Sequence, residues 1–337
     1  MWGRTVSPVV AAVLAVFLGG AVLSAVHHAE VVAYRVGEPF GSLVLAIAVT
    51  IIEVALIVTL MIAGAGSTET LARDTVFAAV IMTSNGVVGL SILAGTRRTA
   101  VVSFNAEGAR ASLATVATLS TLGLVLPTFT TSRPGPVFSP AQLAFAAVTA
   151  IAMYALFVAL QTGRHRDYFL PAAGEEAAAD HAGSPSTAAA LISLALLIVA
   201  LVDVVGDAKM VSPAIERIVT AAGLPVSVVG VVIAMLVLLP ETLAAIRAAR
   251  RGNLQNSLNL AYGSAIASIG LTIPTIAVAS IWLPVPLHLG LDQTDIVLFA
   301  LTCLVSVLTV IPGRATLLQA GVHLALLAAY LFLAISP

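Results

Sequence analysis

The chain of 337 residues is 60% hydrophobic and 9% charged, and its mean hydropathy is +1.09. Soluble domains carry about 25% charged residues, so this composition excludes a soluble globular protein and indicates an all-α polytopic membrane protein. The net charge of −1 gives no sign of a nucleic-acid partner, and the single cysteine, Cys303, excludes a disulfide framework or a cysteine-based metal site.

Apolar runs long enough to cross a bilayer, about 20 residues each, recur along the whole sequence. We predict ten spans, near residues 8–27, 41–63, 74–95, 110–130, 140–161, 187–206, 225–247, 256–282, 295–311 and 315–335. They divide evenly around one polar segment. This division predicts two five-helix halves, residues 1–161 and 187–337, joined by a linker at residues 162–186.

The orientation is predicted from Lys and Arg, which accumulate on the cytoplasmic side of membrane proteins. Under the ten-span arrangement one side carries Arg4, Arg73, Arg133, Lys209 and Arg217. The other carries Arg35, Arg97, Arg98, Arg110, Arg164, Arg166, Arg247, Arg250, Arg251 and Arg314. We therefore expect a cell (inner) membrane protein with a cytoplasmic linker and both termini outside. The linker contains three acids and a histidine, and it is either a solvated tether or a weak cation sensor. These residues are Glu175, Glu176, Asp180 and His181.

An internal repeat is visible when two acids in apolar spans are used as anchors. Glu53 lies in the second span and Glu241 in the seventh, and each span precedes one with a small polar cluster. The clusters are Thr83-Ser84-Asn85-Gly86 and Tyr262-Gly263-Ser264-Ala265. We predict ion-binding repeats at about residues 37–95 and 226–282. Because each half has an odd number of spans, related halves must be inverted in the membrane.

An ionisable side chain at bilayer depth usually faces a partner, an ion or a water-filled cavity. Inverted repeats meet near the midplane, and Pro240 is expected to kink the seventh helix beside Glu241. The candidate site residues are Glu53, Glu241, Thr50, Ser84, Asn85, Ser264 and Ser268. Carboxylate, hydroxyl, amide and carbonyl oxygens together form a hard site that suits Ca²⁺, Na⁺ or K⁺.

Simpler roles remain open for the same residues. Each glutamate is alternatively a protonated, hydrogen-bonded structural acid, and the small hydroxyl residues alternatively serve close helix packing. His323, alone among Leu and Ala in the last span, is better interpreted as a packed core histidine than as a proton relay. The sequence has no P-loop or Rossmann glycine pattern, so no nucleotide and no cofactor is expected.

The segments Gly37–Val54 and Leu239–Pro274 resemble the bacterial ChaA-type branch of the cation/Ca²⁺ exchanger superfamily, and the similarity extends over nearly the whole chain. The resemblance implies ten core helices in two inverted five-helix halves, with the glutamates of the second and seventh helices as ion ligands. It also implies proton-coupled export of Ca²⁺, with Na⁺ or K⁺ handled as well.

The sequence departs from related branches at two places. Val49-Thr50-Ile51-Ile52 and Val237-Leu238-Leu239-Pro240 stand where the vacuolar branch has a Gly-Asn-Ala-Ala-Glu type sequence, and Tyr262–Leu271 lacks the aspartate of Na⁺/Ca²⁺ exchangers. Fewer oxygen ligands favour protons as the counter-ion.

We therefore expect a secondary cation/proton antiporter, not an enzyme, that works by alternating access with Ca²⁺, or Na⁺ or K⁺, and the proton sharing one midplane site. The resemblance suggests the first and sixth spans as the moving pair. A Na⁺/Ca²⁺-type exchanger and a passive cation channel are the alternatives. An intramembrane hydrolase fits less well, since His-Glu-x-x-His is absent. The expected partners are membrane lipid, inorganic cations and protons.

Overall fold

The computed structural model describes residues 8–37, 40–63, 69–97, 99–170, 185–225, 227–282 and 287–337. The first half contains α1 (Pro8–Val36), α2 (Phe40–Ala63), α3 (Leu71–Ile81), the π-helix η1 (Met82–Val87), α4 (Val88–Gly95), α5 (Ala106–Ser120), the π-helix η2 (Thr121–Val125), α6 (Leu126–Phe129), α7 (Pro140–Ala159), the π-helix η3 (Leu160–Arg164) and the 3-10 helix η4 (Arg166–Phe169). The second half contains α8 (Thr187–Ala221), α9 (Ser227–Arg250), α10 (Leu254–Ala267), the π-helix η5 (Ser268–Thr272), α11 (Ile273–Ala279), α12 (Gln293–Val310) and α13 (Leu317–Ile335).

Within these described ranges, 9 helices are long and apolar enough to cross a membrane. The stretch Ile47–Ile62 within α2 adds a shorter apolar helix. The predicted all-α, membrane-spanning fold is therefore confirmed. The linker residues 171–184, which include Glu175, Glu176, Asp180 and His181, lie outside the described residues.

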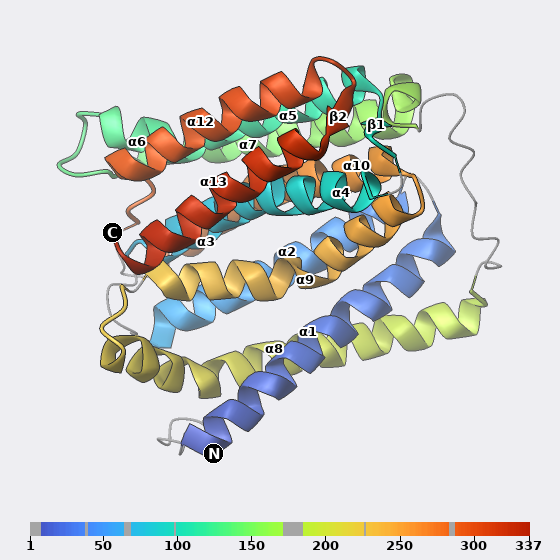
Figure 1. Ribbon diagram of the computed structural model, residues 1–337. Helices are drawn as coiled ribbons and strands as arrows, with labels where there is room; N and C mark the ends of the chain where they lie inside the picture. The colour runs from blue at the N-terminus through green and yellow to red at the C-terminus, as the bar shows by residue number, and fades with distance from the viewer. Residues whose placement is uncertain are drawn as a thin grey trace.

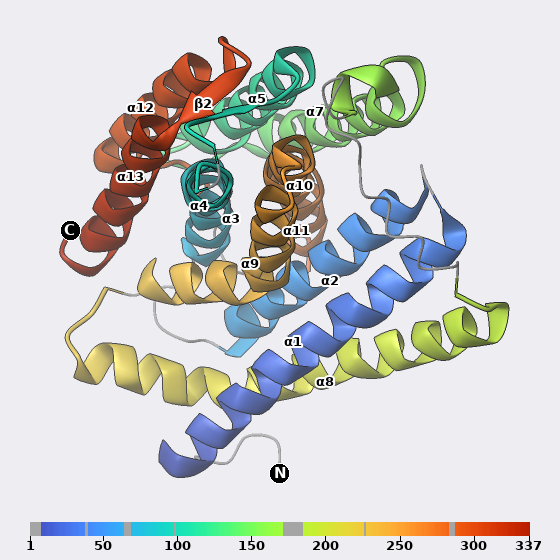
Figure 2. The ribbon, with the colours of Figure 1, turned by 45° about the vertical axis from the view of Figure 1, so that its right-hand side comes forward.

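The helices form layers (Figures 1 and 2). α1 and α8 pack against each other on one side of the molecule and cover α2 and α9. Behind α2 and α9 lie the two interrupted helices, α3–η1–α4 and α10–η5–α11. α5, α7, α12 and α13 form the far layer, so the helices that carry the two glutamates lie inside the bundle.

α1 and α8 are longer than the spans predicted for them. The helices continue to Val36 and Ala221, past the predicted span ends near residues 27 and 206. Polar side chains such as His27 and Asp207 lie inside these helices, since a helix satisfies its own backbone hydrogen bonds whichever side chains it carries. A tilted helix also accommodates more residues than the minimum needed to cross.

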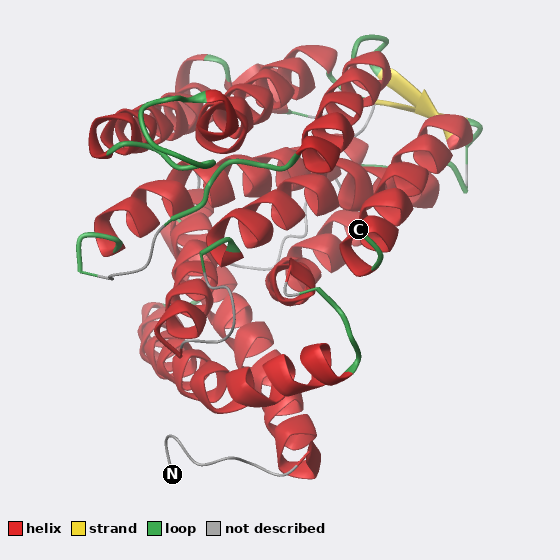
Figure 3. Cartoon of the chain, turned by 90° about the vertical axis from the view of Figure 1, so that its left-hand side faces the viewer, coloured by secondary structure: helices red, strands yellow, loops and turns green. Residues whose placement is uncertain are grey.

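The bundle has two ends, which we name by the chain connections. The linker face is the end at which α7 ends and α8 begins, and the opposite face is the end at which α8 ends and α9 begins. At the linker face, β1 (Val101–Ser103) pairs antiparallel with β2 (Arg314–Thr316), and Val102 lies opposite Ala315 (Figure 3). This two-stranded ribbon ties the α4–α5 connection to the α12–α13 connection.

Both halves repeat one local arrangement. A glutamate-bearing helix, α2 or α9, is followed by a helix interrupted at mid-length by a π-helix, η1 or η5. A π-turn inserts a residue into the helical register and is frequent at functional sites. The interrupted helices are therefore the natural place to look for polar groups that face the glutamates.

Candidate cation site

The two acids lie near the middle of their helices. Glu53 is only 4% exposed in α2, and Glu241 is partly buried in α9, directly after Pro240. The chain crosses the bundle in opposite directions along α2 and α9. The two carboxylates therefore reach the membrane interior from opposite halves of the chain.

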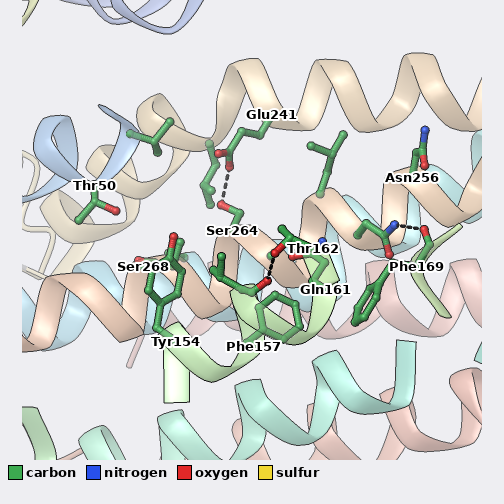
Figure 4. A pocket seen from close by; sticks show the side chains of 18 of the residues that line it. Thr50, Tyr154, Phe157, Gln161, Thr162, Phe169, Glu241, Asn256, Ser264 and Ser268 are labelled. Atoms are coloured by element: carbon green, nitrogen blue, oxygen red, sulfur yellow. Dashed lines mark hydrogen bonds between the residues drawn. The ribbon is translucent and has the colours of Figure 1, made fainter. Parts of the chain in front are cut away.

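One face of α10 and η5 holds both carboxylates. The Ser264 hydroxyl donates to Glu241 Oε2 (Figure 4), and the Ser268 hydroxyl donates to Glu53 Oε1 at 2.6 Å. These serines are one helical turn apart, a rise of about 6 Å. The second interrupted helix thus holds the two acids at successive positions along its own axis.

The two acids lie near each other, because the serines that hold them are one helical turn apart. Holding two ionised carboxylates together in a low-dielectric interior is unfavourable, so one or both must bind a proton or a cation. Within the described ranges no group of three or more His, Cys, Asp or Glu side chains converges as a metal site. A cation here would be held by two carboxylates and neutral oxygens, which suits reversible binding of a hard ion.

A cavity of about 540 Å³ leads to these acids. Its lining on α10 follows a helical face that starts near the linker face at Asn256, continues through Asn259 and Ser264, and ends at Ser268 in η5. Twelve residues of helix correspond to about 18 Å of depth. The outer end is lined by Tyr34, Gln161, Thr162, Arg166 and Asn256. The cavity therefore opens at the linker face and ends at the carboxylates.

Beyond the carboxylates, toward the opposite face, the interior is apolar. Leu56, Ile57 and Leu60 follow Glu53 along α2, and they belong to one buried cluster with Ile233 of α9 and Ile276 of α11. We call these five residues the apolar seal. None of them lines the cavity. In this conformation the site is connected to the linker face and closed toward the opposite face.

The predicted candidates divide into two groups. Glu53, Glu241, Thr50, Ser264 and Ser268 all line the cavity. Thr50 lies on α2 one turn from Glu53, as its spacing predicts.

Ser84 and Asn85 in η1 lie elsewhere. Both are buried, and neither lines the cavity. Asn85 Nδ2 donates to Thr302 Oγ1 at 2.9 Å, and Asn85 Oδ1 is 3.1 Å from His323 Nδ1. His323 Nε2 is in turn 3.1 Å from Thr309 Oγ1. The polar cluster of the first half therefore faces α12 and α13, and His323 is a buried, hydrogen-bonded histidine.

Several lining residues were not found from the sequence. Tyr154 and Gln161 reach the cavity from α7 and η3, and Asn256 reaches it from α10 (Figure 4). Arg166 lines it from η4 and Asn259 from α10. The helical spacing of Asn256, Asn259 and Gly263 ahead of Ser264 was an available signal for a polar face. Nothing in the local sequence marks Tyr154, since its neighbours on α7 are apolar.

The sequence is similar to known proteins along nearly its whole length. The family described as "Sodium/calcium exchanger protein" matches residues 6–163 and 192–336. The chain is 46% identical over 320 residues to the protein y4hA of Sinorhizobium fredii, covering 95% of this chain and 87% of that protein. It is 34% identical over 337 residues to the sodium-potassium/proton antiporter ChaA of Escherichia coli, covering 98% of this chain and 91% of ChaA.

Two solved structures share the fold at low sequence identity. Native YfkE superposes with a TM-score of 0.72 at 19% identity, covering 97% of this chain and 91% of YfkE. The H⁺/Ca²⁺ exchanger CAX superposes with a TM-score of 0.73 at 19% identity, covering 95% of this chain and 82% of that one. At this identity the likeness concerns the fold.

Proposed function

The chain belongs to the sodium/calcium exchanger protein family, and we propose that it is a cation/proton antiporter whose cation and proton share Glu53 and Glu241. As a multi-pass membrane protein of this family it is a secondary transporter. The observation that carries the proposal is the pair of carboxylates at the inner end of one cavity, each bonded by a serine of the same helix.

Competition for the two carboxylates explains exchange. Two ionised carboxylates neutralise one divalent cation, and two protons neutralise them equally. With neither bound, the change of accessibility would have to bury two unneutralised negative charges among apolar side chains, which is strongly unfavourable. Only the protein with a cation or protons bound therefore switches its site from one side of the membrane to the other. Cation movement in one direction is then coupled to proton movement in the other.

The cargo we propose is Ca²⁺, with Na⁺ and K⁺ as the other candidates. Charge balance favours a divalent ion on two carboxylates, while one monovalent ion and one retained proton give the same net charge. Relatives support both: ChaA is a sodium-potassium/proton antiporter, and CAX is an H⁺/Ca²⁺ exchanger. Oxygen sites discriminate between such ions by ligand number and cavity size.

Alternating access requires a second conformation that opens the site toward the opposite face. We propose that α1 and α8, which pack mainly on each other and on α2, move as a pair against the rest of the bundle.

We also propose that the linker face is cytoplasmic and that both termini are outside, since the predicted distribution of Lys and Arg favours the linker side by ten to five. The cavity then opens to the cytoplasm.

Proton movement distinguishes this function from its rivals. In inside-out vesicles with an acidic lumen, adding Ca²⁺, Na⁺ or K⁺ should release luminal protons when the wild-type protein is present. Glu53→Gln and Glu241→Gln should each reduce this release by about 100-fold or more, because the site loses a charge that it must alternately expose. Ser91→Ala, in a buried serine of α4 outside the cavity, is the control.

A passive channel would dissipate a cation gradient with no proton release. A Na⁺/Ca²⁺-type exchanger would move Ca²⁺ only against Na⁺. Either result, or wild-type exchange rates in both glutamine variants, would contradict the proposal.

A further inference from the structure

The cavity mouth carries a positive charge. Among the described residues that line the cavity, the charged ones are Glu53, Glu241 and Arg166. The glutamates lie at the inner end, whereas Arg166 is exposed and lies in the segment that follows α7 at the linker face. A cation that enters from this face passes the guanidinium group before it reaches a carboxylate.

The segment that carries Arg166 is fixed to the cavity wall. The backbone carbonyl of Phe169, at the end of η4, accepts a hydrogen bond of 2.7 Å from Asn259 Nδ2 on α10. On its other side η4 packs against α5, where a Cβ at Gly108 would lie 2.2 Å from the Tyr168 carbonyl oxygen. This close approach requires glycine. Arg166 is therefore carried by a backbone held from two sides.

Its depth follows from the register of α10. Asn259, which anchors η4, precedes Ser264 by five residues, a rise of about 8 Å. Arg166 is three residues before Phe169, so it lies close to this anchor, on the linker-face side of the carboxylate that Ser264 holds. Arg166 has no acidic partner among the described residues, unlike Arg110, which pairs with Glu107 at 2.6 Å. Its charge is therefore not balanced by an ion pair in this part of the chain.

We propose that Arg166 determines specificity by valence: its charge opposes the entry and binding of divalent cations more strongly than that of monovalent cations. This inference rests on the proposed antiport function. The interaction energy of an ion with a fixed charge is proportional to the ion's own charge. The factor by which Arg166 weakens a divalent cation is therefore the square of the factor for a monovalent one. For an example separation of about 10 Å in water, Coulomb's law gives about twofold for K⁺ or Na⁺ and about fourfold for Ca²⁺.

The test measures half-saturating concentrations of Ca²⁺ and K⁺ in inside-out vesicles at low ionic strength. If the protein transports only one of the two cations, the affinity for the other is measured from its inhibition of that transport. In Arg166→Gln we expect the value for Ca²⁺ to fall about fourfold and that for K⁺ about twofold, as the square law requires. Both changes should shrink at 0.15 M salt, where the Debye length is about 8 Å.

Two variants separate charge from shape. Arg166→Lys keeps the charge and should behave as wild type. Arg164→Gln removes a neighbouring exposed arginine that does not line the cavity, and it should change both values less than Arg166→Gln does. In right-side-out vesicles, where the cation meets the other face, Arg166→Gln should have no effect on entry.

Three results would overturn the inference: equal changes for the two cations, the same change in Arg166→Lys, or a change that salt does not reduce. If wild type exchanges cations for protons and the glutamine variants at Glu53 and Glu241 do not, such a result overturns the role of Arg166 alone. If wild type exchanges nothing, the proposed function fails, and this inference fails with it. Melting temperatures of all the variants, compared with wild type, show whether each is folded.

Discussion

The two sides of the glutamate pair are built differently. Toward the linker face the carboxylates meet a cavity lined by Asn256, Asn259 and Gln161, whose amides can solvate a passing cation. Toward the opposite face they meet the apolar seal, of which Leu56 and Ile57 are nearly or fully buried. Polar groups at membrane depth are tolerated where they line a cavity, and apolar packing excludes water elsewhere. The carboxylates therefore mark a boundary between a hydrated and a dry half.

Polar contacts also hold the helix ends together at the opposite face, beyond the apolar seal. Asp74, at the start of α3, accepts a hydrogen bond from Thr70 Oγ1 at 2.9 Å and pairs with Arg73 at 2.7 Å. Arg73 Nη1 also donates to the Gly290 carbonyl at 3.1 Å, which ties α3 to the segment before α12. Opening this side requires these contacts or the apolar seal to rearrange, whereas the linker side is already open.

The largest expected contrast is in water access. Cys303 is the one cysteine of the chain, so Cys303→Ala provides a background for single cysteines. A cysteine at Asn256, in the open cavity, should react with a charged thiol reagent about 100 times faster than one at Leu60, in the apolar seal, since thiol reactivity requires access and the thiolate form. Equal rates, measured by mass shift under conditions that favour this conformation, would contradict a one-sided opening.

The next contrast is between cation and proton at the boundary itself. Lower pH adds protons to Glu53 and Glu241, and a cation must displace them, so cation binding weakens as pH falls. In the range where protons and cation compete, the half-saturating cation concentration should rise about tenfold per pH unit for each proton displaced. The measurement is cation dependence of exchange at several pH values. If the half-saturating cation concentration did not change with pH, the proton and the cation would bind at different sites, and the proposal of a shared site would be wrong.

Removing the serine contacts should have a smaller effect. Hydrogen bonds to charged groups contribute about 1.5–3 kcal/mol, so Ser264→Ala and Ser268→Ala should weaken cation binding by about tenfold or somewhat more. Loss of the donor favours the protonated carboxylate over the ionised one. Ser91→Ala is the matched control, because the Ser91 hydroxyl is buried and makes no hydrogen bond to the described residues. If Ser264→Ala, Ser268→Ala and Ser91→Ala bind the cation with equal affinity, Ser264 and Ser268 do not stabilise the ionised carboxylates.

The last contrast is in stability and leaves transport aside, and two glycines compare the two halves. A Cβ at Gly230, in the closed half, would lie 2.9 Å from the Thr75 backbone nitrogen, whereas a Cβ at Gly263, in the cavity wall, meets nothing within 4 Å. Gly230→Ala should destabilise the protein by about 1–3 kcal/mol through overpacking. Gly263→Ala should be neutral or slightly stabilising, since alanine favours helix. Thermal unfolding in detergent tests this, and equal melting temperatures would refute the close packing.

Much of the fold was predictable because each membrane span is determined by the hydropathy of its own stretch of sequence. Length and hydropathy fix where a helix can cross, and two acids in otherwise apolar spans mark the central helices. The inverted relation of the halves and the limits of the ion-binding repeats remain predictions. The kink at Pro240 remains a prediction too, although Pro240 does lie inside α9 next to Glu241.

The side-chain set of the site was only partly predictable, because it depends on helix rotation. Asn85 lies inside η1, and a π-turn shifts the face on which every later residue lies. The sequence cluster around Asn85 is real, but it meets Thr302 and His323, not the glutamates. Ser268 similarly serves Glu53 of the other half, a pairing that depends on tertiary packing.

The central claim is that one cation displaces protons from Glu53 and Glu241. Calorimetric titration of the purified protein with Ca²⁺ or K⁺, in buffers of different ionisation enthalpy, counts the protons released per cation bound. We predict proton release in the wild type, reduced release in each single glutamine variant and none in the Glu53→Gln/Glu241→Gln double variant. Cation binding without proton release, or undiminished release in the double variant, would contradict the account.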